Sequence, residues 1–589
     1  MTDFLLSLNQ YHIYEKLKKI KPELQKKLSK QIMDLDRSYP GGLAAYVKKA
    51  KQLLQDAKTG INPFEGFVPE IPQGFSLTEI NSKYEELEEL GIKNAKDLCF
   101  VLVAGGVGDR LGYNGIKVEI PLDLITCKTY LENYCQKILI LQNKTNELNC
   151  TDVKLPLAIM TSDDTHEKTI NLLKKEDYFG LDKNNVNILK QDKVPALKDN
   201  EAHFLLGDDN LLVTKPHGHG DVHMLLHKEG LVKKWKQENK KYLLFFQDTN
   251  LQLFRALPAA LGVSVKEKLD MNFLTSPRRA GEAAGAITKL KNKDTSMVVN
   301  IEYNQLAPLL KETVNPKGDE ADPKTGLSPY PGNLNVLLLH IDKYNDALEK
   351  NSGVISEFIN PKYADEKKLK FKKPARIESM MQDIAKVMTG ANIQYTNFKR
   401  LWAFSPLKNA LSEAIKKFKN GLPSDSAISA ENDLYALNRE KLKLAGMKIQ
   451  KGNTRKVNGI EFYDGAKVIL NYVTLNELKE NIKGGSISNK STLVIEQNTV
   501  KLDNLTLDGT LIIQAVAGVY LTLKNVTIVN KYVKLKKLTE LEMSDPDVPQ
   551  YLKIRGYKIE KPEDKIYLRF LKPGKYEINQ SNITEYLSD

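Results

Sequence analysis

From residue 97 onward, short apolar runs alternate with longer amphipathic segments, and this alternation restricts the possible fold more than any other feature of the chain. Such a pattern is typical of βαβ units, in which helices cover the faces of a mainly parallel sheet. The pattern predicts helices at residues 129–142 and 165–175. It predicts strands at residues 99–105, 155–162, 186–191, 242–248, 268–276, 296–303 and 334–341.

The 589 residues exceed what one hydrophobic core usually organises, so we expect more than one domain. Residues 1–95 show apolar residues at steps of three or four, which predicts a helical N-terminal region. Residues 96–435 form the expected α/β domain. Residues 436–589 carry short, evenly spaced apolar runs, which predict a β-rich domain with a repeating architecture, either a parallel β-helix or a small sandwich.

Charge and cysteine content exclude several classes of protein. The net charge is +13, but the lysines are scattered along the chain, so we expect no nucleic-acid partner. Four cysteines without a CxxC pair are too few to cross-link so long a chain, which favours a reducing, cytoplasmic location. No run approaches the roughly 20 apolar residues of a membrane helix, and the N-terminus lacks a signal-peptide pattern, so we expect no membrane association.

A glycine-rich loop follows the first predicted strand of the α/β domain. The segment 101–121 reads VLVAGGVGDRLGYNGIKVEIP, and closely spaced glycines let backbone amides approach a polyphosphate. Its spacing matches neither the P-loop nor the GxGxxG fingerprint. Arg110 and Lys117 add positive charge beside the glycines. The loop therefore predicts a phosphate-binding site of another type.

The strings LVAGG, GDRLG and YNGIK closely resemble the signature loop of UDP-sugar pyrophosphorylases, and further matching motifs extend over residues 63–420. The resemblance implies a Rossmann-like, GT-A-like nucleotidyltransferase domain followed by a parallel β-helix. It implies a reversible reaction in which UTP and a sugar 1-phosphate give a UDP-sugar and pyrophosphate. It also implies Arg110, Lys117 and Lys408 as catalytic residues, and nucleotide contacts at Leu102, Ala104, Gly105 and Gly106.

Two further motifs of the α/β domain bear on the nucleotide base. Gln191 lies in QDKVP, directly after a predicted strand, and the resemblance implies that its amide donor and acceptor read the uracil edge. The segment 214–223, TKPHGHGDVH, resembles the PxGHGD loop of the family, which implies that Gly218 and His219 contact uridine. The same histidines, with His223 and His227, also suggest a zinc hydrolase, although Val222 interrupts the HxHxDH pattern.

A carboxylate at the end of the strand FFQD, Asp248, is the candidate ligand for Mg²⁺, because this hard cation prefers oxygen ligands and bound phosphates would supply the others. The resemblance also implies a set of residues that contact the sugar. They are Asn250, Glu282, Glu302 and Asn333. Leu251 replaces the glycine that family members usually have after the Asp248 motif. The sequence around Glu282 departs from the family pattern at Gly281.

The GYNGIK motif favours an enzyme that accepts many sugar 1-phosphates over a glucose-specific enzyme or an N-acetylhexosamine pyrophosphorylase. Two hypotheses about function from other classes of protein remain open at this point. They are the zinc hydrolase and a non-catalytic scaffold that binds partners through its β-repeat. The resemblance also implies a monomer.

Overall fold

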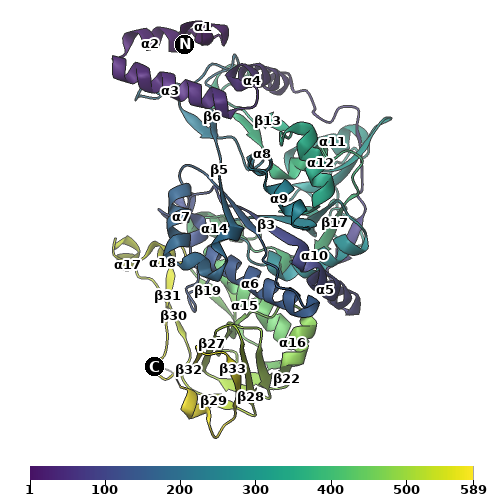
Figure 1. Cartoon of the computed structure of the whole chain (residues 1–589), viewed down its shortest axis with the longest axis vertical. Coiled ribbons are helices and arrows are strands. Elements are labelled where there is room, and N and C mark those ends of the chain that lie inside the picture. Colours follow the sequence, from purple (N-terminus) through teal and green to yellow (C-terminus); the bar gives the residue numbers. More distant parts are fainter. Residues whose placement is uncertain (588–589) are drawn as a thin grey trace.

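The computed structural model describes residues 1–587, which form three layers along the long axis of the molecule (Figure 1). Helices α1 to α4 lie at one end, the α/β domain occupies the middle, and the β-rich domain lies at the other end. This arrangement confirms the predicted fold class. No helix in the described part of the chain is long and apolar enough to cross a membrane.

An eleven-stranded sheet forms the centre of the α/β domain, with the path β2-β17-β9-β12-β8-β3-β4-β5. Neighbouring strands are parallel except β12, which runs antiparallel to both β8 and β9. Each predicted strand of this domain is present. The strands on this path span Gly74–Leu77 (β2), Ile393–Phe398 (β17), Met271–Ser276 (β9), Gly332–His340 (β12), Tyr242–Gln247 (β8), Leu98–Val103 (β3), Leu157–Thr161 (β4) and Val186–Lys190 (β5).

Three further strands extend the sheet beside β12. Strand β10 pairs antiparallel with β1, β11 and β12, and together these strands form the wall beside Glu302 and Asn333. Their bounds are Val68–Glu70 (β1), Ala286–Lys291 (β10) and Ser296–Ile301 (β11). Helices pack on both faces of the sheet: α5 (Ser82–Asn94), α6 (Tyr130–Asn149), α7 (His166–Lys175), α8 (Asp221–Lys228), α9 (Leu231–Gln237), α10 (Leu253–Lys266), α11 (Tyr303–Thr313) and α12 (Ile341–Asn351).

The N-terminal helical layer ends near residue 59 and is shorter than the predicted region 1–95. It consists of α1 (Thr2–Ser7), α2 (Tyr11–Lys19), α3 (Pro22–Ser38) and α4 (Gly42–Thr59). Its apolar face packs on residues of the loops that follow β5, such as Phe204. Strands β1 and β2 and helix α5, by contrast, belong to the α/β domain, because β2 pairs with β17 and Gly91 of α5 contacts the backbone of α10 closely.

The C-terminal domain contains three parallel sheets of four strands, each strand pairing with the equivalent strand of the next coil, as in a parallel β-helix. The first sheet has β18 (Lys448–Ile449), β23 (Ser486–Ile487), β26 (Thr506–Asp508) and β29 (Thr527–Val529). The second has β21 (Lys467–Leu470), β24 (Thr492–Ile495), β27 (Thr510–Ala515) and β32 (Ile566–Phe570). The third has β22 (Ile482–Lys483), β25 (Val500–Asp503), β28 (Val519–Lys524) and β33 (Gly574–Ile578).

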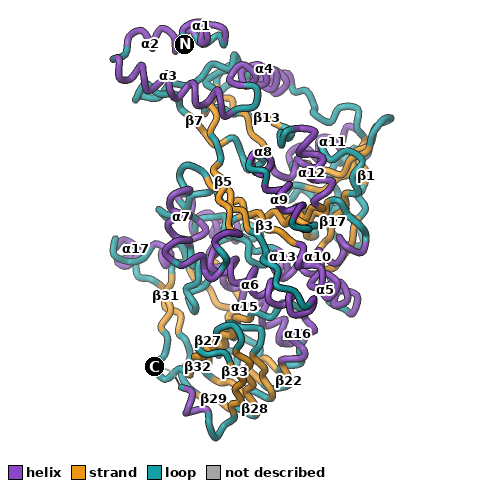
Figure 2. The backbone as a smooth tube through the Cα atoms, in the orientation of Figure 1, coloured by secondary structure: helices purple, strands orange, loops and turns teal. Residues whose placement is uncertain are grey.

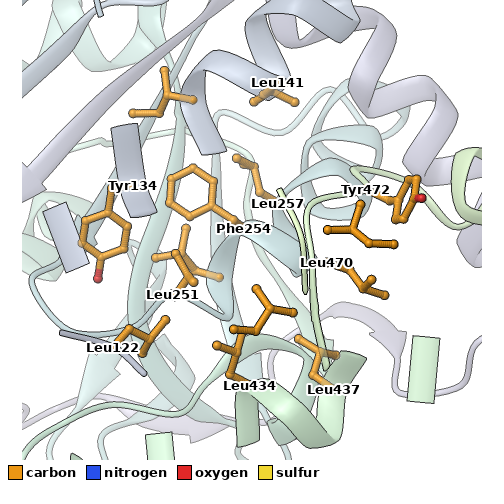
Figure 3. Close-up of a cluster of buried hydrophobic side chains, with 14 of the residues drawn as sticks. Leu122, Tyr134, Leu141, Leu251, Phe254, Leu257, Leu434, Leu437, Leu470 and Tyr472 are labelled. Carbon is orange, nitrogen blue, oxygen red and sulfur yellow. The ribbon is translucent and has the colours of Figure 1, made fainter. Parts of the chain in front are cut away.

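A continuous hydrophobic contact joins the β-rich domain to the α/β domain. Helix α15 (Ala427–Leu444) lies between the two, so the predicted boundary at residue 436 falls inside a helix. Buried side chains of α6, α10 and α15 meet those of β21 and of the chain that follows it (Figure 3): Leu141, Phe254, Leu257, Leu434, Leu437, Leu470 and Tyr472. The buried Lys441 of α15 donates a hydrogen bond to the backbone oxygen of Tyr472 (3.1 Å). The two domains therefore share one core.

Residues 530–565 leave the β-helix between β29 and β32 and return to the α/β domain. This excursion, called the C-terminal strap below, contains β30 (Lys534–Lys537), α17 (Glu540–Ser544), α18 (Gln550–Lys553) and β31 (Tyr557–Glu560). In Figure 2 it runs beside the β-helix toward α7. The strap brings a distant part of the sequence next to the glycine-rich loop.

Candidate active site

The glycine-rich loop begins where β3 ends, at the carboxyl end of the parallel strands, where open α/β sheets bind their ligands. The loop folds back on itself, because the amide of Gly108 donates to the oxygen of Gly115 (2.9 Å). A Cβ atom on Gly106 would lie 2.9 Å from Asp248 Oδ2 and 3.1 Å from Lys117 Nζ. Glycine at this position therefore allows a lysine and a carboxylate from distant parts of the chain to approach the same backbone.

Lys117 and Asp248 form an ion pair, with 3.4 Å between Nζ and Oδ2. Asp248 follows β8 and is buried, and burial raises the pKa of its carboxyl group, although the Lys117 ammonium opposes this shift. In residues 1–587 no three His, Cys, Asp or Glu side chains gather into a complete metal site. The single carboxylate fits a cation that takes most of its ligands from bound phosphates, as Mg²⁺ does in many phosphoryl-transfer sites.

Lys408 and Arg110 are both exposed. The segment before Lys408 is fastened to the strand end beside Asp248, since the Leu407 amide donates to the Thr249 oxygen (3.1 Å). Although Lys408 keeps exposed surface, the protein around its side chain removes water and lowers its pKa, and Lys117 is one of the cations that add to this effect. Lys408 is therefore close enough to Lys117 for the two charges to interact. Arg110 lies in the short helical turn Asp109–Leu111 of the glycine-rich loop.

Leu102 and Ala104 support the loop from below. The side chain of Leu102 is completely buried in the core, so it offers a ligand no side-chain surface. Ala104 is 2 % exposed, and its amide donates to the Met160 oxygen (2.8 Å). Among the four predicted loop contacts, Gly105 and Gly106 remain the ones whose surfaces are partly open.

Gln191 follows β5 directly and is 5 % exposed. Its Nε2 donates to the Gly218 oxygen and to Asp221 Oδ2 (3.2 Å). Its Oε1 faces the glycine-rich loop, 3.6 Å from where a Cβ on Gly105 would lie. The structure thus brings Gln191, Gly105 and Gly218 together, as the sequence predicted. Gly218 has a φ of +128°, and a Cβ there would lie 2.3 Å from the Ser379 oxygen, so only glycine fits.

The histidines of the segment 217–227 each contact different partner atoms. His219 Nδ1 accepts a hydrogen bond from the Met381 amide (3.0 Å), and His223 lies between the Tyr344 hydroxyl and the Met381 oxygen, each at 2.8 Å. Burial lowers the pKa values of His219 and His223 to about 4, so both are neutral at pH 7. His227 lies 3.5 Å from Glu349. Because these rings do not converge on one point, the arrangement does not support the zinc hydrolase.

The candidate sugar residues occupy three places. Glu302 and Asn333 lie near each other at the ends of β11 and β12, joined through Asn300, which donates to Glu302 Oε1 (2.8 Å) and accepts from Asn333 Nδ2 (3.1 Å). Glu282 lies in a separate loop and accepts from the Arg279 amide (2.9 Å). Asn250 is buried, and its side chain bonds to the backbone of Ala403 and Ser405.

The sequence motifs did not identify Asn300, although its spacing from Glu302 indicated it. Residues two apart on a strand point to the same face, and Asn300 precedes Glu302 by two positions. Gly285 lies opposite it, where a Cβ would meet Asn300 Oδ1 at 2.3 Å. The glycine, Asn300, Glu302 and Asn333 therefore form one polar surface.

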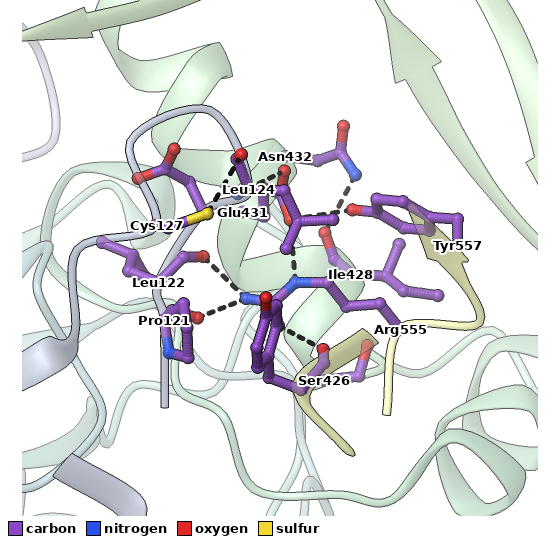
Figure 4. A network of polar contacts seen from close by, with 12 residues as sticks. Pro121, Leu122, Leu124, Cys127, Ser426, Ile428, Glu431, Asn432, Arg555 and Tyr557 are labelled. Carbon is purple, nitrogen blue, oxygen red and sulfur yellow. Dashed lines mark hydrogen bonds and ion pairs between the residues drawn. The ribbon is translucent and has the colours of Figure 1, made fainter. Parts of the chain in front are cut away.

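A buried polar network connects the loop after Lys117 with the C-terminal strap (Figure 4). Arg555 of the strap donates to Glu431 Oε2 of α15 (2.9 Å) and to the backbone oxygens of Pro121 and Leu122. Tyr557 adds a hydrogen bond to the same carboxylate (2.9 Å). Farther along the loop, the Asn114 amide donates to Gln550 Oε1 of α18 (2.7 Å). Nothing in the local sequence around Arg555 indicates these contacts, because they join segments more than 100 residues apart.

Comparison with known proteins agrees with the motifs. Residues 68–305 match the family model for UTP-glucose-1-phosphate uridylyltransferase. The chain is 40% identical to a UDP-sugar pyrophosphorylase of Arabidopsis thaliana over 98% of this chain and 95% of that protein. It is 42% identical to a UDP-sugar pyrophosphorylase of Oryza sativa subsp. indica, over 96% of this chain and 92% of the relative.

Among solved structures, the UDP-N-acetylglucosamine pyrophosphorylase of Trypanosoma brucei superposes with a TM-score of 0.60. The superposition covers 76% of this chain and 86% of that one, at 19% identity, and so shows a shared fold. The high identity to the plant proteins over nearly the whole chain shows more than a shared fold. The chain belongs to the UDP-sugar pyrophosphorylase family of uridylyltransferases.

Proposed function

We propose that this uridylyltransferase transfers the uridylyl group of UTP to several different sugar 1-phosphates, with the pocket between Gly106, Lys117 and Asp248 holding the triphosphate. The observation that carries the proposal is the meeting of a lysine and a carboxylate over a glycine that has no room for a side chain. Both charged groups lie at the carboxyl end of the sheet.

The reaction needs no general base. A phosphate monoester has a second pKa near 6, so a sugar 1-phosphate is mostly a dianion at pH 7. One of its oxygens attacks the α-phosphorus of UTP, a new P–O bond forms, and the bond to pyrophosphate breaks. The same steps run backwards when pyrophosphate attacks the UDP-sugar. The task of the protein is therefore to align two polyanions and to stabilise the charge on them.

Different residues would contribute to the alignment of the two polyanions and to the stabilisation of their charge. Lys117 and Lys408 would stabilise the negative charge that develops around the α-phosphorus and on the departing pyrophosphate. Arg110, which is exposed in the same loop, would attract the β- and γ-phosphates. The amides of Gly105 and Gly106 would bind phosphate oxygens. Each charge-assisted contact contributes about 1.5–3 kcal/mol.

Asp248 would hold Mg²⁺ together with phosphate oxygens. Bound there, Mg²⁺ would neutralise charge on the triphosphate. In the described structure Lys117 occupies the position beside this carboxylate. Its ammonium group would turn from Asp248 to the phosphates when nucleotide and metal bind, because the two cations would otherwise compete for one carboxylate.

On the sugar side, Glu302 and Asn333, together with Asn300, would form hydrogen bonds with sugar hydroxyls. Asn250 would act from a distance by fixing the segment that leads to Lys408, since its amide already bonds to that backbone. The partly exposed positions of Glu302 and Asn333 support broad acceptance of sugars. We also propose that the protein is a monomer and that it acts in the cytoplasm; the four free cysteines support a reducing compartment.

The test is an assay of pyrophosphate release by the purified chain with UTP, MgCl₂ and, separately, glucose, galactose, glucuronic acid, xylose and N-acetylglucosamine 1-phosphates. We expect activity with the first four sugars and a weak response to the fifth. Activity with glucose 1-phosphate alone would contradict broad specificity. A lack of pyrophosphate release with every sugar, in protein that is folded, would contradict the proposed reaction.

A further inference from the structure

A chain of buried polar contacts runs from the N-terminal helical layer to Gln191. The Tyr39 hydroxyl donates to Glu357 Oε1 (2.8 Å), which lies 2.9 Å from His217 Nε2. His217 Nδ1 contacts Asp221 Oδ1, and Asp221 Oδ2 accepts from Gln191 Nε2 (3.2 Å). The side chains of His217 and Glu357 are each 10% exposed and that of Asp221 is 4% exposed. Gln191, which faces the candidate base site, is therefore the last residue in a chain of buried side-chain contacts.

The contacts of Gln191 fix which end of its amide faces the ligand. Both hydrogens of Nε2 are used within the protein, one by the Gly218 oxygen and one by Asp221. Turning the amide over would place Oε1 against a carbonyl oxygen and a carboxylate, leaving buried acceptors without donors, which costs about 1–3 kcal/mol. Oε1 faces the glycine-rich loop and accepts no hydrogen bond from any residue in the range 1–587. Gln191 thus presents an acceptor and no donor to a bound base.

His217 in turn fixes the role of Asp221. Burial alone would lower the pKa of His217, but the carboxylates of Asp221 and Glu357 outweigh that effect and raise it to about 9. The ring is therefore protonated at neutral pH and pairs with both carboxylates. A group at position 221 must then present an acceptor to His217, and the ionised carboxylate also presents one to Gln191.

We propose that Asp221, held by His217 and Glu357, is a positioning residue that fixes the amide of Gln191 with only its acceptor toward the base, and that it thereby selects UTP over CTP. Uracil carries a hydrogen on N3 and donates it, whereas N3 of cytosine is an acceptor and would oppose Oε1. A site built around one buried hydrogen bond rejects the base that cannot make it. This inference rests on the proposed function, because it assigns the base that the pocket takes.

Asp221→Asn tests the proposal with almost no change in shape. Because His217 needs an acceptor, the substituted side chain would direct its oxygen there and its NH₂ group toward Gln191, where Nε2 now lies. The amide of Gln191 would lose its fixed orientation. We expect the ratio of kcat/KM for UTP to that for CTP to fall at least tenfold, while KM for the sugar 1-phosphate is unchanged. Glu357→Gln should shift the ratio in the same direction by a smaller factor.

The matched control is Asp192→Asn, the same substitution in the residue next to Gln191, which should leave the ratio within about twofold. An unchanged ratio in folded Asp221→Asn protein would overturn the inference, as would wild-type protein that uses UTP and CTP equally. Wild-type protein that releases no pyrophosphate from either nucleotide would instead contradict the proposed function. If Asp221→Asn does not fold, Glu357→Gln decides the question by the same ratio.

Discussion

The nucleotide half and the sugar half of the candidate site are built in different ways. On the nucleotide half, Gln191 and the loop around Lys117 are held by buried charged groups that come from outside the sheet, namely His217 with Glu357 on one side and Arg555 on the other. On the sugar half, two amides and a carboxylate bond mainly to one another.

The difference suggests where the protein is specific. A group fixed by buried ion pairs cannot adapt without leaving a charge unpaired, which is costly. The amides of Asn300 and Asn333, beside the partly exposed Glu302, exchange hydrogen-bond partners at a cost of about 1 kcal/mol each. We therefore expect a strict choice of base and a tolerant choice of sugar.

The largest expected effect concerns the C-terminal strap. Arg555→Met removes the partner of the buried Glu431 carboxylate, and breaking a buried pair in this way costs about 3–5 kcal/mol. The free energy of unfolding, measured with urea, should fall by that amount. KM for UTP should rise, because the oxygens of Pro121 and Leu122 also lose their donor.

The double variant Arg555→Met with Glu431→Gln serves as the control. It removes the unpaired charge, so it should recover part of the lost stability. A single variant as stable as the wild type would show that the strap does not anchor the nucleotide loop. The nucleotide half would then not be held by a buried ion pair on the side of Arg555.

The ion pairs of His217 should make stability depend on pH. Because the folded protein raises the pKa of His217 from 6.5 to about 9, its stabilising contribution is complete below pH 6.5 and is lost as the pH rises through 9. Between these limits it falls by about 1.4 kcal/mol per pH unit. The difference in unfolding free energy between wild type and His217→Gln should therefore be large at pH 6 and shrink toward pH 9.5. A difference that stays constant over this range would show that His217 is not held in its charged form.

Lys117→Ala should lower kcat by roughly ten- to a few hundredfold, since it removes one charge-assisted contact to the reacting phosphates. The fold should survive, because the side chain is partly exposed and Asp248 can be protonated or solvated in its absence. Lys236→Ala, which breaks a surface ion pair with Asp342, is the control and should leave kcat unchanged. Near-normal turnover of folded Lys117→Ala protein would remove this lysine from the mechanism.

The sequence predicted the parts of the molecule that depend on local patterns. Every predicted strand of the α/β domain is present, and the short apolar runs of the C-terminal domain also form strands, because apolar runs of four to eight residues between turns are typical of buried strands. The local pattern did not decide between a parallel β-helix and a small sandwich for the C-terminal domain. Gly106, Lys117 and Asp248 do meet, as the glycine spacing and the strand-end carboxylate indicated. Their individual roles in binding and catalysis remain predictions.

Contacts between distant segments could not be predicted in this way. Periodicity shows that residues 82–94 form a helix, but not that this helix packs on α10 and so belongs to the α/β domain. Likewise, Arg555 lies in a region with no distinctive motif, and its partners are known only from the fold. For Gln191, the sequence suggested a donor and an acceptor for the base, whereas the structure leaves only the acceptor free.

The smallest expected effect is on the sugar half. Asn333→Ala should remove one hydrogen bond to a sugar hydroxyl, worth about 1 kcal/mol, and so raise KM for the sugar 1-phosphate roughly fivefold. Because Asn333 also donates to Asn300 (3.1 Å), Asn300→Ala and the double variant should show coupling, with the double variant less impaired than the sum of the two. KM for UTP should not change in any of the three. An equal rise in both KM values would mean that the two halves are joined more tightly than their separate contacts indicate, and that the tolerance for different sugars must come from elsewhere in the pocket.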